Sequence, residues 1–203
     1  MKLYYSPGAC SLSPHIVLRE LGLPVDLVKV DLSTHKTADG GDYLAINPKG
    51  YVPVLQLDDG SLLTEGPAIV QYLADRAPAA KLAPAAGTMA RYRLMEWLNY
   101  LTSEIHKGFS SLFNAKLSEE TKVIMREAMA RRFDYLSTQL RDKLYLMGDD
   151  FTVVDAYLFT LLGWCRLTQI DLSKWPTLAA YVERIAKRPS VRVAMKAEGL
   201  IKA

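Results

Sequence analysis

The sequence predicts two domains of different class, an α/β domain over residues 1–78 and an all-helical domain over residues 88–203. The first stretch mixes short strand-like segments with helical patterns, whereas every periodic segment after residue 88 has helical spacing. Residues 79–87, which contain proline, glycine and several alanines, have the composition of a linker. A chain of 203 residues is long enough to bury a hydrophobic core in such an arrangement.

Three patterns predict the elements of the first domain. Alternating apolar and polar residues indicate strands, apolar residues at helical spacing indicate helices, and proline, glycine and aspartate mark turns. Strands are predicted at residues 2–6, 25–32, 52–57 and 61–64, and helices at 11–21 and 66–77. Pro7-Gly8 ends the first strand, and Pro14 is tolerated because it lies in the first turn of its helix. Asp58-Asp59-Gly60 predicts a hairpin between the last two strands.

The second domain is predicted to contain only helices. They are expected at residues 88–113, 119–144, 153–168, 176–187 and 190–197. Thr152 and Asp155 have the spacing of a capping box ahead of an apolar run, and Pro176 and Pro189 suit helix starts.

Composition and charge argue against several classes of protein. Half of the residues are hydrophobic, 23% are charged and the net charge is +3, with Lys and Arg spread along the chain, which disfavours a nucleic-acid surface. The longest apolar run, residues 153–164, is too short to span a bilayer and contains Asp155. The first ten residues lack the apolar segment of a signal peptide, so we expect a cytoplasmic protein and no membrane partner.

Cys10 is the first candidate for chemistry. It follows the turn that joins the first strand to a helix, where unpaired amides and the helix dipole favour a thiolate. The alternative is that Cys10 packs as a small apolar residue. Cys165 lies in an apolar helical stretch and is interpreted as structural, and two cysteines are too few for a disulfide framework. Trp164 beside it lines either a pocket or the core.

Two further segments offer backbone groups to a ligand. Pro53 at the start of a strand is explained by a cis Val52-Pro53 bond, which leaves the Val52 backbone to pair with a peptide-like ligand, or by an edge strand with a trans proline. Glu65-Gly66 opens a helix and suits the ammonium and carboxylate of an amino-acid-like group, or is ordinary N-terminal helix chemistry.

A polar stripe lies on the long helix of the second domain. Asn99, Ser103, His106 and Ser110 are spaced 4, 3 and 4 apart and share one face, which is either a solvated surface or a site that binds a thiol or polar ligand. The three histidines and two cysteines lack metal-ligand spacing, and no phosphate-binding or dinucleotide glycine motif occurs, so neither a metal nor a nucleotide cofactor is expected. Position 13 is serine, which disfavours a dithiol oxidoreductase.

Together these features resemble the bacterial, cysteine-containing beta class of glutathione S-transferases. The resemblance is carried by residues 1–20, 47–53, 63–69, 97–100, 104–107, 151–158 and 197–200, so it runs nearly from end to end. It implies a thioredoxin-like α/β N-terminal domain followed by an all-α C-terminal domain. It also implies a homodimer with glutathione as co-substrate and no tightly bound cofactor.

The resemblance also implies roles for individual residues. Cys10 contacts the glutathione sulfur, and His106 lies near that sulfur. Val52, before the cis proline Pro53, pairs with the cysteinyl part of glutathione. The remaining residues implied for glutathione are Glu65 and Gly66 at the γ-glutamyl end, His35 at the glycyl carboxylate, and Asn99 and Ser103 at the border of the site. Residues expected to line the electrophile pocket are Tyr5, Phe109, Phe113 and Trp164.

His35 departs from the family pattern, because similar members carry lysine there. Histidine is mostly neutral at pH 7, so we expect weaker binding of the glycyl carboxylate, improving at lower pH. Lys36 is a substitute only if its side chain turns toward the ligand.

The activity implied is conjugation of the glutathione thiolate to small hydrophobic electrophiles. An alternative is a glutathione-dependent thiol transferase or reductive dehalogenase in which Cys10 is the nucleophile. An alternative of another class is a non-catalytic protein that binds glutathione or a hydrophobic ligand.

Overall fold

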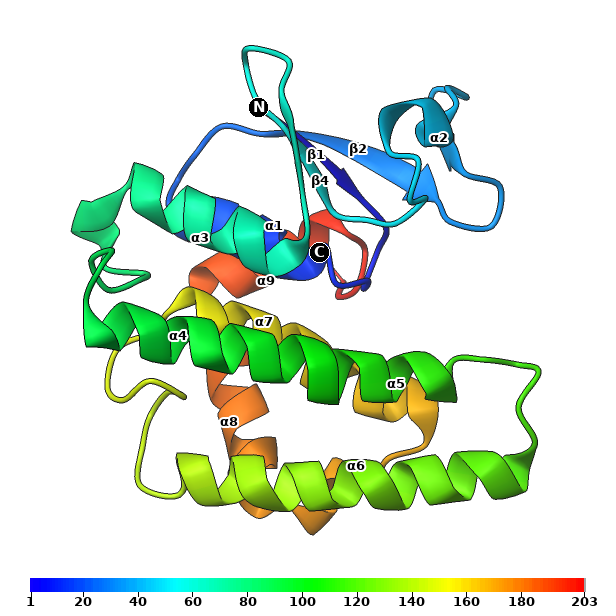
Figure 1. The fold of residues 1–203 in the computed structure, drawn as a ribbon, viewed down its shortest axis with the longest axis vertical. Helices are drawn as coiled ribbons and strands as arrows, with labels where there is room; N and C mark the ends of the chain where they lie inside the picture. Colours follow the sequence, from blue (N-terminus) through cyan, green and yellow to red (C-terminus); the bar gives the residue numbers. More distant parts are fainter. Residues whose placement is uncertain (203) are drawn as a thin grey trace. The chain divides into compact units, whose positions relative to one another are not determined.

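The computed structural model describes residues 1–202, which form two compact units (Figure 1). Unit 1 contains residues 1–83 together with the described residues from 187 onward, and unit 2 contains residues 84–186. The C-terminal segment, which the sequence assigns to the helical domain, therefore belongs with the N-terminal half. The reason is long-range packing, because α9 (Pro189–Ala197) lies against α1 (Leu12–Glu20).

Unit 1 is built on a five-stranded sheet in the order β3-β2-β1-β4-β5. The strands are β1 (Lys2–Tyr5), β2 (Asp26–Asp31), β3 (Lys36–Thr37), β4 (Val54–Gln56) and β5 (Leu62–Thr64). β1 and β2 are parallel, a pairing that needs a crossover connection, here through α1, and the other pairs are antiparallel. The predicted hairpin joins β4 to β5, with Gly60 at a φ of +88° in its turn.

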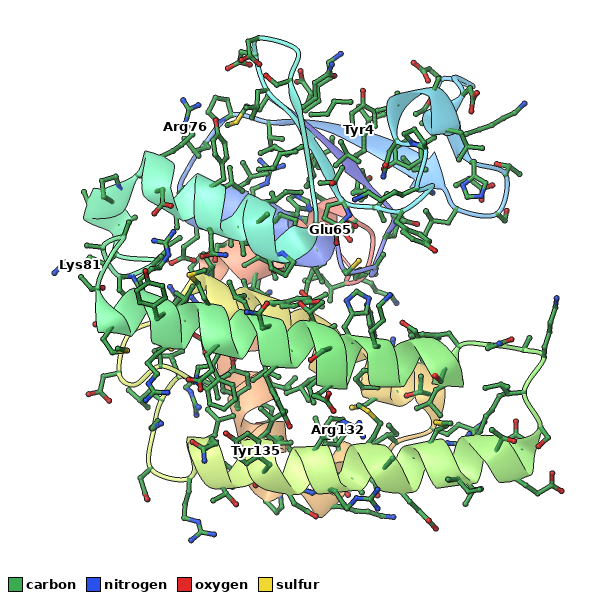
Figure 2. All side chains as sticks on the ribbon, viewed as in Figure 1. Tyr4, Glu65, Arg76, Lys81, Arg132 and Tyr135 are labelled. Atoms are coloured by element: carbon green, nitrogen blue, oxygen red, sulfur yellow. The ribbon has the colours of Figure 1, made fainter. Side chains whose placement is uncertain are left out.

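Helices cover the sheet of unit 1. α1 packs against both α9 and α3 (Gly66–Arg76), which is followed by the short 3₁₀ helix η1 (Pro78–Ala80). β3 and the four-residue helix α2 (Tyr43–Ile46) were not predicted, because neither is long enough to show a period. α2 places Tyr43 in a buried cluster with Tyr4, Val30, Val52 and Val54. The labelled Tyr4 lies at the sheet in Figure 2.

Unit 2 is helical, as predicted. It contains α4 (Met89–Tyr100), the π-helix η2 (Leu101–His106), α5 (Lys107–Leu112), α6 (Glu119–Leu140), α7 (Val153–Leu162), the 3₁₀ helices η3 (Gly163–Thr168) and η4 (Leu172–Lys174), and α8 (Pro176–Ala186). The helix expected over 88–113 is thus interrupted by a π-helical turn, and the one expected over 153–168 ends in 3₁₀ geometry. α6 ends at Leu140 instead of residue 144.

Every residue of α7 is buried, and this helix contacts α4, η2, η3 and α8. Figure 1 shows α6 alongside α4 and α5, which lie in line with each other. Tyr135 and Arg132 of α6, labelled in Figure 2, contact α4 and η2. The ring centroids of Tyr135 and Tyr100 are 5.3 Å apart, and Arg132 Nε donates to Glu104 Oε2 at 2.9 Å. No helix among residues 1–202 combines the length and apolar character needed to cross a membrane.

Candidate functional site

Cys10 lies in a turn that its neighbours hold rigidly. The Ser11 hydroxyl accepts from the Ser6 amide and donates to the Ser6 carbonyl, both at 3.2 Å. Gly8 has a φ of +70°, a conformation that glycine adopts without strain. The side chain of Cys10 is half-buried, carries a thiol and donates to the Val52 carbonyl oxygen at 3.2 Å. Cys10 and Val52, which are 42 residues apart in sequence, are therefore in direct contact.

The start of α1 offers fewer amides than the sequence analysis assumed. The Leu12 and Ser13 amides donate to the Ala9 and Cys10 carbonyls, and Pro14 has no N–H. The helix dipole still favours an anion at this end. Stabilisation of a thiolate must therefore depend less on first-turn amides than expected.

The Val52-Pro53 peptide bond is cis. β4, which follows it, pairs with β1 on one side and β5 on the other, so the alternative of an edge strand with a trans proline is wrong. The preceding carbonyl, of Tyr51, accepts from the Tyr43 hydroxyl at 2.7 Å and from Asn47 Nδ2 at 2.8 Å. Burial raises the pKa of Tyr43 to about 12, so this donor keeps its proton. These bonds fix the backbone that leads into Val52.

Glu65 stands at the start of α3 with a φ of +67° (Figure 2). Its Oε1 accepts from Lys49 Nζ at 2.5 Å, and Lys49 Nζ also donates to Thr64 Oγ1 at 2.8 Å. The ion pair is exposed, with 46% of the Lys49 side chain and 68% of the Glu65 side chain accessible, so it is weak and its partners can be exchanged. The carboxylate predicted to receive an ammonium group already binds one.

Gly66 supplies an amide at the first position of α3, but Pro67 after it has none. The amides of Ala68 and Ile69 donate to the Glu65 carbonyl. A Cβ added at position 66 would meet only Pro53 Cγ, at 3.9 Å, so packing within the chain does not require glycine there.

His35 has a φ of +52°, and its ring lies on the backbone of Gly50. A Cβ at Gly50 would come within 2.9 Å of His35 Cε1, which explains glycine at that position. The His35 Nδ1 atom is buried and has no hydrogen-bond partner among residues 1–202. Lys36 lies on β3, where it pairs with Asp31.

A buried network that the sequence analysis missed lies behind the Cys10 turn. Glu198 Oε2 accepts from the Gly8 amide at 2.9 Å, and Glu198 Oε1 lies 2.8 Å from Nδ1 of His15. Arg19 Nε donates to His15 Nε2 at 3.2 Å, so Nε2 is an acceptor and Nδ1–H donates to Glu198. Glu198 follows His15 by 183 residues, and no local pattern links them.

In unit 2, His106 is the last residue of η2, where Lys107 donates to the carbonyl of Thr102, five residues back. The His106 Nδ1 atom lies 2.7 Å from the hydroxyl of Tyr157, a residue that the sequence analysis did not select. The ring centroids of His106 and Trp164 are 5.0 Å apart. Of the predicted stripe, Asn99, Ser103 and Ser110 are exposed and His106 is half-buried.

The aromatic residues predicted for the electrophile pocket differ in accessibility. Phe109 has an exposed fraction of 0% and Trp164 is buried, whereas Phe113 is 47% exposed and its ring lies 5.5 Å from that of Trp164. Tyr5 is a buried residue of β1 in unit 1, beside His15, and burial together with the Glu198 charge raises its pKa. Among these residues Phe113 offers the most accessible ring.

Two other predictions concern cysteine and metal. Burial raises the pKa of Cys165 to about 12, in agreement with a structural thiol. Residues 1–202 contain no group of three or more metal-ligating side chains.

Comparisons with known proteins agree with this architecture. Residues 8–76 match the family described as "Glutathione S-transferase, N-terminal domain", and residues 100–189 match "Glutathione S-transferase, C-terminal domain". Glutathione S-transferase GstA of Escherichia coli O157:H7 is 48% identical over 200 residues, which cover 98% of this chain and all of that protein.

Two solved structures are similar over almost the whole chain. The beta-class glutathione S-transferase of Sphingomonas chungbukensis is 52% identical, with a TM-score of 0.96 over 99% of this chain and 100% of its own. A sphingomonad glutathione S-transferase complexed with glutathione is 48% identical, with a TM-score of 0.95 over 99% and 100% of the two chains.

The chain therefore belongs to the glutathione S-transferase family, and within it to the bacterial beta class. The predicted fold class, a thioredoxin-like domain followed by a helical domain, is confirmed. The protein is a glutathione transferase, and the prediction of an enzyme is confirmed at that level.

Proposed function

We propose that unit 1 binds glutathione along the Cys10 turn and the segment that leads into Val52. The Val52 backbone pairs with the cysteinyl part of glutathione, and the sulfur lies at Cys10. The contact between Cys10 Sγ and the Val52 oxygen carries this proposal, because it puts a half-buried thiol beside a peptide group suited to an extended ligand. Within residues 1–202 the Val52 amide has no hydrogen-bond partner, which supports the same pairing.

The two ends of glutathione are assigned to charged or polar groups that flank Val52. The γ-glutamyl ammonium goes to Glu65 and its carboxylate to the Gly66 amide. Lys49 releases Glu65 when the ligand ammonium arrives, which costs little because the ion pair is exposed. The glycyl carboxylate goes to His35. The Nδ1 atom of this histidine is buried, so the contact with the carboxylate is assigned to Nε2.

The reaction proposed is conjugation of glutathione to a small hydrophobic electrophile. The glutathione thiol gives its proton to solvent, and the thiolate attacks an electrophilic carbon. A carbon–sulfur bond forms and a leaving group such as chloride departs. His106 assists as a hydrogen-bond donor to the anionic sulfur, Asn99 and Ser103 contribute polar contacts, and the exposed ring of Phe113 contacts the electrophile. We further propose a cytoplasmic homodimer, on the strength of the family resemblance.

A second activity, thiol transfer, is favoured by the accessibility of Cys10. Its thiolate would attack a mixed disulfide of glutathione, releasing the other thiol, and a second glutathione would then regenerate Cys10 and leave as glutathione disulfide. This chemistry requires the Cys10 sulfur, whereas conjugation requires only the glutathione sulfur.

The test is an activity panel on Cys10→Ala and His106→Ala. We expect Cys10→Ala to abolish thiol transfer and to retain part of the conjugation of a chlorodinitrobenzene, and His106→Ala to lower conjugation about tenfold or more. Cys165→Ala serves as the control thiol substitution. If both site variants kept every glutathione-dependent activity, the assignment of Cys10 and His106 would be wrong. Retention on glutathione-agarose without turnover would favour the non-catalytic binder.

A further inference from the structure

The ring of His106 contacts two residues that follow it by 51 and 58 positions. Tyr157 on α7 bonds to Nδ1 at 2.7 Å, and its ring stands at 73° to the imidazole with centroids 6.0 Å apart. Trp164 on η3 makes an edge contact at 69°. Because one ring nitrogen is bonded and the ring is packed by two aromatic neighbours, His106 has a defined orientation.

The direction of the Tyr157–His106 bond decides what the other ring nitrogen does. A phenol with an ordinary pKa near 10 keeps its proton at neutral pH, whereas a neutral imidazole has one donor and one acceptor nitrogen. If the Tyr157 O–H donates, Nδ1 is the acceptor and the ring proton is on Nε2. If Nδ1–H donates instead, Nε2 is an acceptor and repels an anionic sulfur.

We propose that Tyr157 is a positioning residue that donates its hydroxyl proton to His106 Nδ1 and thereby keeps the imidazole proton on Nε2. His106 is then a neutral hydrogen-bond donor of fixed orientation within unit 2, able to serve an anionic sulfur. This inference rests on the proposed function, in which His106 serves glutathione conjugation.

The surroundings of Tyr157 suit such a role. Only 3% of the residue is exposed, so bulk water does not compete for its hydroxyl. α7, which carries it, is anchored at its first turn: Asp155 Oδ2 accepts from the Thr152 amide, and Asp155 Oδ1 accepts from the Leu146 amide, both at 2.9 Å. A hydroxyl on a buried, anchored helix is a more rigid partner for His106 than a loop residue would be.

The decisive variant is Tyr157→Phe, which removes one oxygen and keeps the ring. The matched control is Tyr181→Phe, because Tyr181 is a buried tyrosine of α8 whose hydroxyl bonds Asp155 and not His106. The readouts are the imidazole nitrogen shifts in a long-range ¹⁵N–¹H NMR spectrum, recorded without glutathione, and the kcat and KM of conjugation. The chain has three histidines, so a His106→Gln spectrum identifies the His106 signals.

We expect the wild-type protein to show an unprotonated Nδ1 and a protonated Nε2 on His106. Tyr157→Phe should give mixed tautomers and lower kcat by about tenfold, the loss expected for one hydrogen bond, with the KM for glutathione unchanged. Tyr181→Phe should lower stability and leave the His106 tautomer as in the wild type. A wild-type proton on Nδ1, an unchanged tautomer in Tyr157→Phe, or an unchanged kcat would each overturn the proposal.

A separate measurement, the conjugation rate of His106→Gln, tests the proposed function itself. If His106→Gln conjugated glutathione at the wild-type rate, the role of His106 in catalysis would be lost, whatever tautomer the NMR spectrum of the wild-type protein showed.

Discussion

Each unit contains a buried carboxylate that supports a residue of the candidate site: Glu198 supports the Cys10 turn, and Asp155 supports the helix that carries Tyr157. The two carboxylates differ in how far along the chain their partners lie. In unit 1, Glu198 joins the Gly8 amide of the Cys10 turn to His15, and its partners lie 190 and 183 residues away. In unit 2, Asp155 joins Thr152, Leu146 and Tyr181, which lie 3, 9 and 26 residues away. One carboxylate is therefore bound by groups distant in the chain, and the other by groups that lie within 26 residues of it.

The largest effect is expected from Asp155→Ala. Two backbone amides and a phenol would lose their acceptor inside the core, so the free energy of unfolding of unit 2 should fall by about 4 kcal/mol. Denaturant titration measures the loss, and hydrogen exchange should locate it in residues 144–185. Loss of protection in unit 1 alone would contradict the local role of Asp155.

Asp155→Asn, the matched control, keeps one acceptor oxygen, so its free energy of unfolding should fall by less than that of Asp155→Ala. Burial raises the pKa of Asp155, although its hydrogen bonds oppose the shift. Because the folded state then holds the proton more tightly, the wild type gains stability relative to Asp155→Asn as the pH falls. This gain is complete below the ordinary value near 3.8 and is lost as the pH rises through the raised folded-state pKa.

A smaller effect is expected from Glu198→Ala. The Gly8 amide and His15 would lose their acceptor, at a cost of about 2–3 kcal/mol, and hydrogen exchange should rise in residues 6–20. Glu198→Gln keeps an acceptor for Gly8 and should retain more activity. If Glu198→Ala lowered stability and left exchange of the Gly8 amide unchanged, the carboxylate would not hold the Cys10 turn.

The smallest effect on stability is expected from alkylation of the thiols. This reaction compares the accessibility of Cys10 in unit 1 with that of Cys165 in unit 2. With a pKa of about 12, Cys165 is ionised to only ~10⁻⁴ at pH 8, whereas Cys10 is half-buried and belongs to a turn at a helix start. Native protein treated with iodoacetamide should therefore carry a single carbamidomethyl group, on Cys10, by peptide mass spectrometry. Denatured protein should carry two, and prompt labelling of native Cys165 would be the contrary result.

Local signals in the sequence predicted much of the fold. The Asp58–Gly60 turn, the proline at the start of α8 and the Thr152–Asp155 pair are each visible within a few residues, and the structure has the corresponding hairpin, helix start and bonded cap. The π-helical turn at η2 was not predictable, because apolar spacing does not distinguish one π turn within a long helix.

The supports of the candidate site were harder to predict. Cys10, Val52 and His106 were selected from position and resemblance. The side chains that bind or orient the site residues, such as Lys49 and Tyr157, were identified only in the structure. Lys49 reaches Glu65 across 16 residues, and Tyr157 reaches His106 across 51. Such contacts depend on tertiary packing, which a single sequence records only as separate residues.

The return of α9 to unit 1 has a consequence for how the protein is made. During synthesis the first 83 residues leave the ribosome long before residues 187–202, yet these late residues supply the packing partner of α1 and the acceptor for the Gly8 amide. The N-terminal unit must therefore wait for translation to be almost finished before its last layer is added. A nascent chain halted before residue 187 would hold a thiol whose supporting turn is still incomplete.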